Sequence, residues 1–235
     1  FEEEIIKTSN ISGFLVSNKN PKNIESFNRG SWWVQDFSSF FPLFNFDKEN
    51  KFKNYLDACA APGGKSFQIL SRKINITLND KNLSRIKVLK SNLKRLKFDT
   101  KILNEDFIKL RSDKKYDVII IDAPCSAVGT IRKNPEIFFK SKDPDFINLL
   151  KIQEEMLLKA ASLLKSRGLV IYMVCSFLKA ETSDQINKFF KKKSNFKLCN
   201  FKLSNQNTIY SKLIKDNCMK TFPTRILNNN IDCYF

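Results

Sequence analysis

The sequence of 235 residues contains no histidine, and this absence narrows the chemistry open to it. A Ser-His-Asp triad, a Cys-His pair and a His-ligated metal site are all excluded. Any general base must therefore be a carboxylate, a thiolate, a lysine or a water molecule. The six cysteines form no CxxC pair, so the sequence predicts no bound metal.

Long apolar segments are also missing from the sequence. No apolar run is long enough to cross a membrane, and no signal-peptide pattern is present. We therefore expect a cytoplasmic protein with reduced thiols that makes no membrane contact, and we expect it to be a monomer.

Acidic residues are scarce relative to basic ones. There are 41 Lys and Arg against 24 Asp and Glu, which gives a net charge of +17. Residues 57–235 carry 34 basic and 17 acidic side chains, whereas residues 1–56 carry 7 of each. Such an excess favours a polyanionic partner such as nucleic acid. The 33 Lys, 24 Asn and 22 Phe also fit a compositional drift towards a few residue types. The charge alone therefore does not establish that the protein binds nucleic acid.

The pattern along the chain predicts two parts. Residues 1–50 indicate a small N-terminal subdomain, with an irregular lead-in to residue 30 and an apolar run from residue 32 to 46. From about residue 51 strand and helix patterns alternate, which predicts one α/β domain over 51–235 with a mostly parallel sheet and helices on both faces. The expected strands are 55–56, 74–78, 102–103, 118–121, 169–174, 196–201 and 231–235. One helix is expected to end near residue 71, and three more are expected over 83–96, 146–164 and 181–192.

The first chemical motif is Asp57-Ala-Cys-Ala-Ala-Pro-Gly-Gly-Lys-Ser66, which lies where a strand turns into a helix. Its small residues allow the backbone to approach a ligand, and the start of the helix favours a polar or negative group. A P-loop would need glycine at position 59, which is cysteine, so the motif is not a nucleoside triphosphate loop.

Four aspartates end four successive predicted strands: Asp57, Asp80, Asp106 and Asp122. Because the carboxyl ends of parallel strands meet at one edge of a sheet, we expect these side chains on one rim. Asp80 would accept two ribose hydroxyls, and Asp106 would reach an adenine amino group, which suits a nucleoside-containing cofactor. Each aspartate alone is equally well explained as a helix N-cap.

Two further motifs place cysteines directly after buried strands: Asp122-Ala-Pro-Cys125-Ser126 and Val174-Cys175-Ser176. If these strands are neighbours in the sheet, both thiols lie close together above the rim. A thiolate is the best nucleophile available to a chain without histidine, provided that nearby cations or helix N-termini lower its pKa. Either cysteine alone is also explained as a small buried hydrophobic residue.

Together these motifs resemble those of the RNA cytosine-5 methyltransferases, above all the RsmB (Sun) type that acts on bacterial 16S rRNA. Val34-Gln35-Asp36, Asn92-Leu-Lys-Arg95 and Ile131-Arg-Lys-Asn-Pro-Glu136 extend the resemblance, which runs from about Gly30 to the C-terminus. It implies a Rossmann-like methyltransferase fold with a seven-stranded sheet. That family normally carries an N-terminal helical RNA-binding domain, which we do not expect within these 235 residues.

The resemblance also assigns roles to single residues. It implies that S-adenosylmethionine contacts Cys59, Ala60, Ala61, Pro62, Gly63, Gly64, Lys65, Asp80, Asp106 and Asp122. Cys175 would be the nucleophile that adds to C6 of cytosine, Cys125 would resolve the covalent adduct, and Asp122 would hydrogen-bond the ring. Lys65 would either lower a thiol pKa or hold a carboxylate.

RNA contacts follow from the same interpretation. The target base must reach a thiol in the rim of the sheet, so it has to be flipped out or presented in a loop. The candidate phosphate ligands are Arg132, Lys133 and Arg85. The other lysines of the 83–96 helix are equally well explained as a solvated face.

Three alternatives stay open at this point. The same motifs serve enzymes that modify tRNA, and a chain of this fold can also be a non-catalytic RNA-binding or ribosome-assembly module. A DNA cytosine-5 methyltransferase shares the Pro-Cys motif but uses that cysteine as its nucleophile. The second thiol, at Cys175, argues against the DNA enzyme.

Overall fold

A parallel sheet of five strands forms the centre of the computed structural model. The strands are β3 (Asn54–Asp57), β4 (Asn75–Asn79), β5 (Ile102–Leu103), β6 (Tyr116–Asp122) and β7 (Leu164–Met173). Their order is β5-β4-β3-β6-β7, so the direction of chain progression reverses between β3 and β6. The structure describes residues 5–9, 12–15, 20–46, 51–139, 145–199, 213–215, 218–221, 224–226, 229–231, 233 and 235.

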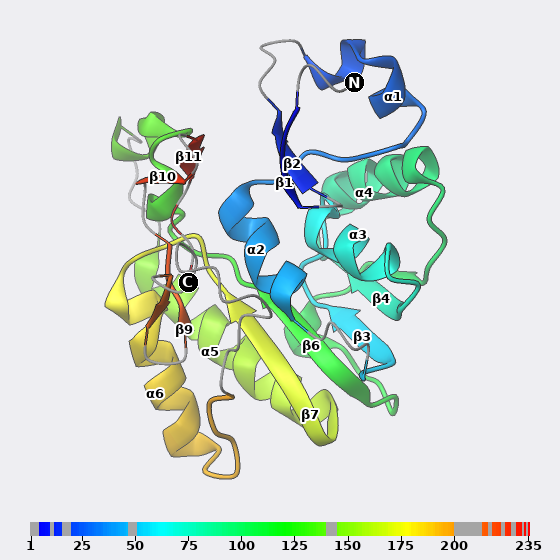
Figure 1. Cartoon of the computed structure of the whole chain (residues 1–235). Coiled ribbons are helices and arrows are strands. Elements are labelled where there is room, and N and C mark those ends of the chain that lie inside the picture. The colour runs from blue at the N-terminus through cyan, green and yellow to red at the C-terminus, as the bar shows by residue number, and fades with distance from the viewer. Residues whose placement is uncertain are drawn as a thin grey trace.

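Helices cover both faces of this sheet, as Figure 1 shows. One face is closed by α2 (Phe37–Asn45), α3 (Gly64–Leu70) and α4 (Leu83–Leu96), and the other by α5 (Phe146–Leu163) and α6 (Ser183–Lys192). The apolar run of β6 contributes to both faces of the sheet. Val118 and Ile120 pack on the face of α2, α3 and α4, and Ile119 and Ile121 pack on the face of α5 and α6. A strand buried on both faces reads as a continuous apolar run for this reason.

Short elements complete the described chain. Three antiparallel pairs are formed by β1 (Ile5–Ser9) with β2 (Ser12–Leu15), β8 (Ile214–Lys215) with β9 (Cys218–Met219), and β10 (Thr224–Ile226) with β11 (Asn229–Ile231). The remaining helix is α1 (Glu25–Asn28), and the 3-10 turns are η2 (Pro21–Asn23), η3 (Phe107–Lys109), η4 (Val128–Thr130), η5 (Pro135–Phe139) and η6 (Lys179–Glu181).

The predicted α/β architecture with a parallel sheet is confirmed, while the N-terminal part differs from its prediction. The lead-in predicted as irregular contains the β1–β2 hairpin, and the apolar run after residue 32 contains helix α2. This helix begins where the Asp36 side chain accepts a hydrogen bond from the Ser38 N–H, 2.8 Å away. Pro42 lies inside it, and the surrounding phenylalanines hide the helical period in the sequence.

The C-terminal part differs as well. The described sheet has five strands rather than seven, and residues 196–199 form no strand, while 200 and 201 lie outside the described residues. Of the expected strand 231–235, Ile231 ends β11, and Phe235 exchanges two backbone hydrogen bonds of 2.9 Å with Val174, an antiparallel pattern directly after β7. Asp232 and Tyr234 lie outside the described residues. Within the described ranges no helix has the length and apolar character that a bilayer span requires.

Candidate functional site

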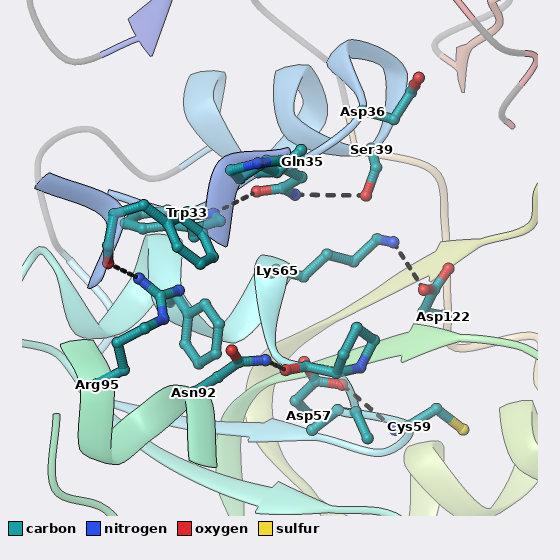
Figure 2. A pocket seen from close by; sticks show the side chains of 18 of the residues that line it. Trp33, Gln35, Asp36, Ser39, Asp57, Cys59, Lys65, Asn92, Arg95 and Asp122 are labelled. Carbon is teal, nitrogen blue, oxygen red and sulfur yellow. Dashed lines mark hydrogen bonds and ion pairs between the residues drawn. The ribbon is translucent and has the colours of Figure 1, made fainter. Parts of the chain in front are cut away.

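A cavity of about 450 Å³ opens at the carboxyl ends of β3 and β6, where the strand order reverses. Open α/β sheets bind their ligands at this place, and the volume suits a small molecule. Asp57, Cys59, Lys65 and Asp122 line it from the sheet side. Segments before the sheet and helix α4 supply the remaining walls (Figure 2).

The turn between β3 and α3 is tightly fixed. Gly63 has a φ of +118°, and a Cβ there would lie 2.0 Å from the ring of Phe67, so the turn requires glycine. Asp57 accepts hydrogen bonds from the Ser66 hydroxyl at 2.6 Å and from the Cys59 N–H at 3.3 Å. These contacts tie the end of β3 to the first turn of α3, where the predicted cofactor motif lies.

Lys65 and Asp122 form an ion pair at the cavity, with Nζ 2.7 Å from Oδ2 (Figure 2). The Lys65 side chain is 8% exposed and the Asp122 side chain 34% exposed. The ammonium is therefore nearly buried, while the carboxylate keeps one side open to the cavity. Of the two roles that the sequence left open for Lys65, this geometry corresponds to holding a carboxylate.

Burial sets the protonation of the two other groups on the sheet side. It raises the pKa of Asp57 to about 6, with the Ser66 hydrogen bond acting in the opposite direction. Burial also raises the pKa of the Cys59 thiol, and the charges of Asp57 and Asp122 add to that shift. Cys59 is thus a neutral thiol near pH 7, unsuited to nucleophilic attack.

The predicted rim of four aspartates divides into two pairs. Asp57 and Asp122 line the cavity, and Asp80 and Asp106 do not belong to its described lining. Asp80 accepts from the N–H groups of Ala61 at 3.3 Å and Asn82 at 2.9 Å. Asp106 caps η3 by accepting from a backbone N–H at 3.1 Å. Both therefore hold backbone turns here, and their contact with a cofactor stays a prediction.

The two cysteines expected to meet lie side by side. β6 and β7 are parallel neighbours, and Sγ of Cys125 is 3.3 Å from Sγ of Cys175, within hydrogen-bond distance for sulfur. The Cys175 carbonyl accepts from the Gly129 N–H at 3.0 Å, and a Cβ on Gly129 would lie 2.9 Å from that oxygen. The hydrogen bond to Cys175 and burial raise the pKa of Cys125 above the ordinary thiol range.

A buried carboxylate beside the thiols escaped the sequence analysis. Glu181 is fully buried and accepts hydrogen bonds from the N–H and the hydroxyl of Ser126 and from Nε2 of Gln153. It follows Cys175 by six residues in a polar stretch, where a solvated side chain is the default expectation. No pattern in the sequence distinguishes it from its charged neighbours.

The wall opposite the sheet was only partly foreseen. Trp33 Nε1 donates to Gln35 Oε1 at 3.0 Å, and Gln35 Nε2 donates to Gln68 at 3.0 Å and to Ser39 at 3.3 Å. Figure 2 shows the contacts of Gln35 with Trp33 and Ser39 above Lys65. Gln35 belongs to the Val-Gln-Asp motif that supports the resemblance, and that motif was the available signal for this wall.

The candidate RNA ligands differ in their surroundings. Lys133 Nζ lies 2.5 Å from a carboxylate oxygen of Asp36, and Arg85 pairs with Asp80 at 3.4 Å and also donates to the Ala61 carbonyl. Arg132 is exposed. Lys133 thus ties the loop after Cys125 to the start of α2, and Arg85 supports the cofactor-motif turn. In the described ranges no three side chains cluster as metal ligands.

Comparison with known sequences gives a consistent result. The family profile described as 16S rRNA methyltransferase RsmB/F matches residues 45–235. Ribosomal RNA small subunit methyltransferase B of Enterobacter sp. (strain 638) is 32% identical over 206 residues, covering 81% of this chain and 48% of the relative. The protein of the same name from Serratia proteamaculans (strain 568) is 36% identical over 148 residues, covering 61% and 34%. The chain spans half or less of these relatives.

Solved structures with the same fold extend the comparison. The crystal structure of PH0851 is 28% identical with a TM-score of 0.79, covering 93% of this chain and 49% of that chain. NSun6 from Pyrococcus horikoshii with SFG is 23% identical with a TM-score of 0.74, covering 91% and 54%, and shows the fold alone. Since the family profile covers most of the sequence, the chain belongs to the RsmB/F family of 16S rRNA methyltransferases.

Proposed function

We propose that the chain is an S-adenosylmethionine-dependent RNA cytosine-5 methyltransferase that acts on a cytosine of small-subunit rRNA. The observation that carries this proposal is the pair of thiols, Cys125 and Cys175, whose sulfur atoms lie 3.3 Å apart after neighbouring strands. Membership of the RsmB/F family supports rRNA as the substrate. In this proposal residues 51–235 form the catalytic domain and residues 1–50 a small subdomain.

The cavity fits the proposed cofactor in size and chemistry. Ala60, Ala61 and Gly64 line it with little side chain, which leaves room for close approach of a ligand. Asp57 and Asp122 offer carboxylate oxygens to the cationic groups of S-adenosylmethionine. When bound, the cofactor supplies an electrophilic methyl group. Contacts of Asp80 with ribose and of Asp106 with adenine belong to the proposal.

Cys175 performs the covalent step in this mechanism. Its thiolate adds to C6 of cytosine, so an S–C6 bond forms and electron density moves to C5, which becomes nucleophilic. Asp122 hydrogen-bonds the ring during the addition, and such proton-transfer help is typically worth about 10²–10⁴-fold. After C5 has gained its methyl group, its proton passes to water and the S–C6 bond breaks. Cys175 then leaves as a thiolate beside Cys125, which resolves the adduct.

The test is methyl transfer to unmodified 16S rRNA and to tRNA, followed by mapping of the modified base. Cys175→Ala should abolish both adduct and turnover, whereas Cys125→Ala should accumulate a covalent RNA–protein adduct on denaturing gels. Full methylation by Cys175→Ala would overturn the nucleophile assignment. Transfer to tRNA alone would replace the substrate. Failure of the chain to bind S-adenosylmethionine would favour the non-catalytic RNA-binding module.

A further inference from the structure

Glu181 is a buried acid that the mechanism above does not use. Its side chain has no exposed surface, and it lies in η6, directly before α6. Taking a carboxylate out of water costs several kcal/mol unless hydrogen bonds replace its hydration. The hydrogen-bond partners of the Glu181 carboxylate therefore indicate the role of this buried side chain.

All three donors to this carboxylate lead to the thiol pair. The Ser126 N–H donates to Oε1 at 2.8 Å, and the Ser126 hydroxyl donates to Oε2 at 2.5 Å. Gln153 donates from the same amide nitrogen to Oε1 at 3.1 Å and to the Pro124 carbonyl at 3.0 Å. The residues on both sides of Cys125 are thus bound to one carboxylate or to its partner.

The same carboxylate belongs to the segment that carries the other thiol. Glu181 follows Cys175 by six residues, and its backbone carbonyl accepts from the Tyr172 hydroxyl at 2.8 Å. Ser126 Oγ also lies 3.5 Å from Oγ of Ser176, the residue after Cys175. Glu181 therefore connects the segment that carries Cys175 to Ser126, the residue after Cys125.

The titratable groups around the pair favour one distribution of charge. The hydrogen bond with Cys175 and burial raise the pKa of Cys125, and the charges of Cys175 and Glu181 raise it further. Burial together with the charges of Cys125 and Glu181 also raises the pKa of Tyr172. A negative charge on Cys125 is therefore disfavoured by the hydrogen bond with Cys175, by burial and by the neighbouring charges of Cys175 and Glu181.

We propose that Glu181 is a positioning residue that sets the distance between the two cysteines and keeps their shared proton on Cys125, so that Cys175 is the thiolate. This inference rests on the proposed function for its catalytic meaning, while the proton distribution is a property of the free protein. As the S–C6 bond breaks, the Cys125 S–H donates a hydrogen bond to the departing Cys175 sulfur. The proton stays on Cys125 and Cys175 is again a thiolate, so the pair returns to its starting state.

The experiment measures thiol reactivity without RNA or cofactor. Iodoacetamide is added over pH 6–10, the thiolate displaces iodide, and initial rates at Cys125 and Cys175 are read by peptide mass spectrometry. In the unchanged protein Cys175 should react at least about tenfold faster than Cys125, the ratio that one pKa unit gives. Comparable rates at the two sites below pH 8 would overturn the inference without any variant.

Glu181→Gln keeps the size of the side chain and its acceptor oxygen but removes the charge. The ratio of Cys175 to Cys125 alkylation should fall by about tenfold, and the rise of Cys125 alkylation should move to lower pH. Glu155→Gln, which removes a half-exposed charge on α5, is the matched control and should leave the ratio unchanged. A ratio within twofold of the unchanged protein in a folded Glu181→Gln variant would refute the role of the charge.

A second readout separates this inference from the proposed function. In single-turnover assays with 16S rRNA, Glu181→Gln should hold the covalent adduct longer, in the direction of Cys125→Ala, and Glu181→Asp should restore part of the release rate. If no RNA is methylated but the alkylation ratio falls, the proposed function fails and the proton assignment stands. If RNA is methylated and the ratio is unchanged, the assignment fails and the proposed function stands.

Discussion

The two faces of the sheet build the two halves of the site by different means. On the α3–α4 face a glycine-containing turn and a half-open ion pair, Lys65 with Asp122, border the cavity. On the α5–α6 face the fully buried Gln153 and Glu181 hydrogen-bond the residues on either side of Cys125. The first half presents a partly exposed carboxylate to the cavity, whereas the second is held by hydrogen bonds between buried groups.

The outer surfaces of the two faces differ in the same sense. Residues 81–97, around α4, contain seven basic side chains and no acidic one, so like charges follow each other along the helix. On α5, Lys151 faces Glu155, and Glu154 pairs with Lys192 of α6. The α5–α6 surface thus pairs part of its charge within the protein. On α4, Arg85 pairs with Asp80, and the like charges of the helix favour an external polyanion or solvent.

Replacing one glycine in each half of the site with alanine should have the largest effects and should show whether the two halves are independent. Gly63→Ala forces a positive φ and a clash with Phe67, while Gly129→Ala drives a Cβ against the backbone near Cys175. Each should lower the free energy of unfolding by about 2–4 kcal/mol in urea titrations. Gly63→Ala should weaken S-adenosylmethionine binding in calorimetry but keep the alkylation ratio, and Gly129→Ala should do the reverse. Loss of both properties in both variants would show that the halves are not independent.

Asp57 gives the cavity half a pH dependence. Its pKa is about 6 in the folded protein against an ordinary 3.8, so between these values the folded state binds more protons than the unfolded state. The free energy of unfolding should therefore fall as pH rises through this window, by about 3 kcal/mol for this group. Asp57→Asn should lack that component when urea titrations at pH 4 and pH 7 are compared. An equal pH dependence in both proteins would contradict the assignment.

Gln153 tests the buried support on the other face. Gln153→Leu leaves the Pro124 carbonyl and Glu181 short of a donor in a fully buried place, which should cost about 1–3 kcal/mol. The matched variant Asn92→Ala removes a solvent-exposed hydrogen bond to the Pro62 carbonyl on the α4 face. We expect less than about 1 kcal/mol there, because water can replace the donor. Equal losses in thermal and urea unfolding would erase the contrast between the faces.

Charge removal on the helices should have the smallest effect on stability. Lys90→Gln with Lys94→Gln on α4, and Lys151→Gln with Lys159→Gln on α5, should each change the free energy of unfolding by less than about 0.5 kcal/mol. Only the α4 pair should weaken RNA binding and reduce its salt dependence, by about one unit of slope for each phosphate that the variant no longer neutralises. Unchanged RNA affinity in the α4 variant would mean that this surface is only solvated.

The helices and strands that could be predicted are those determined by the pattern of their own residues. Helix α4 shows a clean apolar stripe of Ile86, Leu89, Leu93 and Leu96, and β6 is an apolar run buried on both faces, so both were found. The meeting of Cys125 and Cys175 followed from strand order, because neighbouring parallel strands end at one edge. Helix α2 was missed because Pro42 and a run of phenylalanines obscure its period.

Tertiary hydrogen bonding accounts for what the sequence could not predict. Asp80 directly follows β4 and Asp122 is the last residue of β6, yet Asp80 accepts from backbone N–H groups and Asp122 faces the cavity. Sequence spacing is the same for a carboxylate that caps a turn and one that meets a ligand. Glu181 was invisible for a related reason, since its partners come from segments more than 25 residues away.

The ion pair between Asp36 and Lys133 bears on how such proteins can be recombined. It joins the N-cap residue of α2 to the loop beyond Cys125, across 97 positions of sequence. A chimera can take residues 1–50 from a relative that has no acidic residue at position 36. Lys133 would then lose this ion-pair partner. Segment exchange should therefore carry both positions together, and sequence covariation between them is the signature to look for before choosing a crossover point.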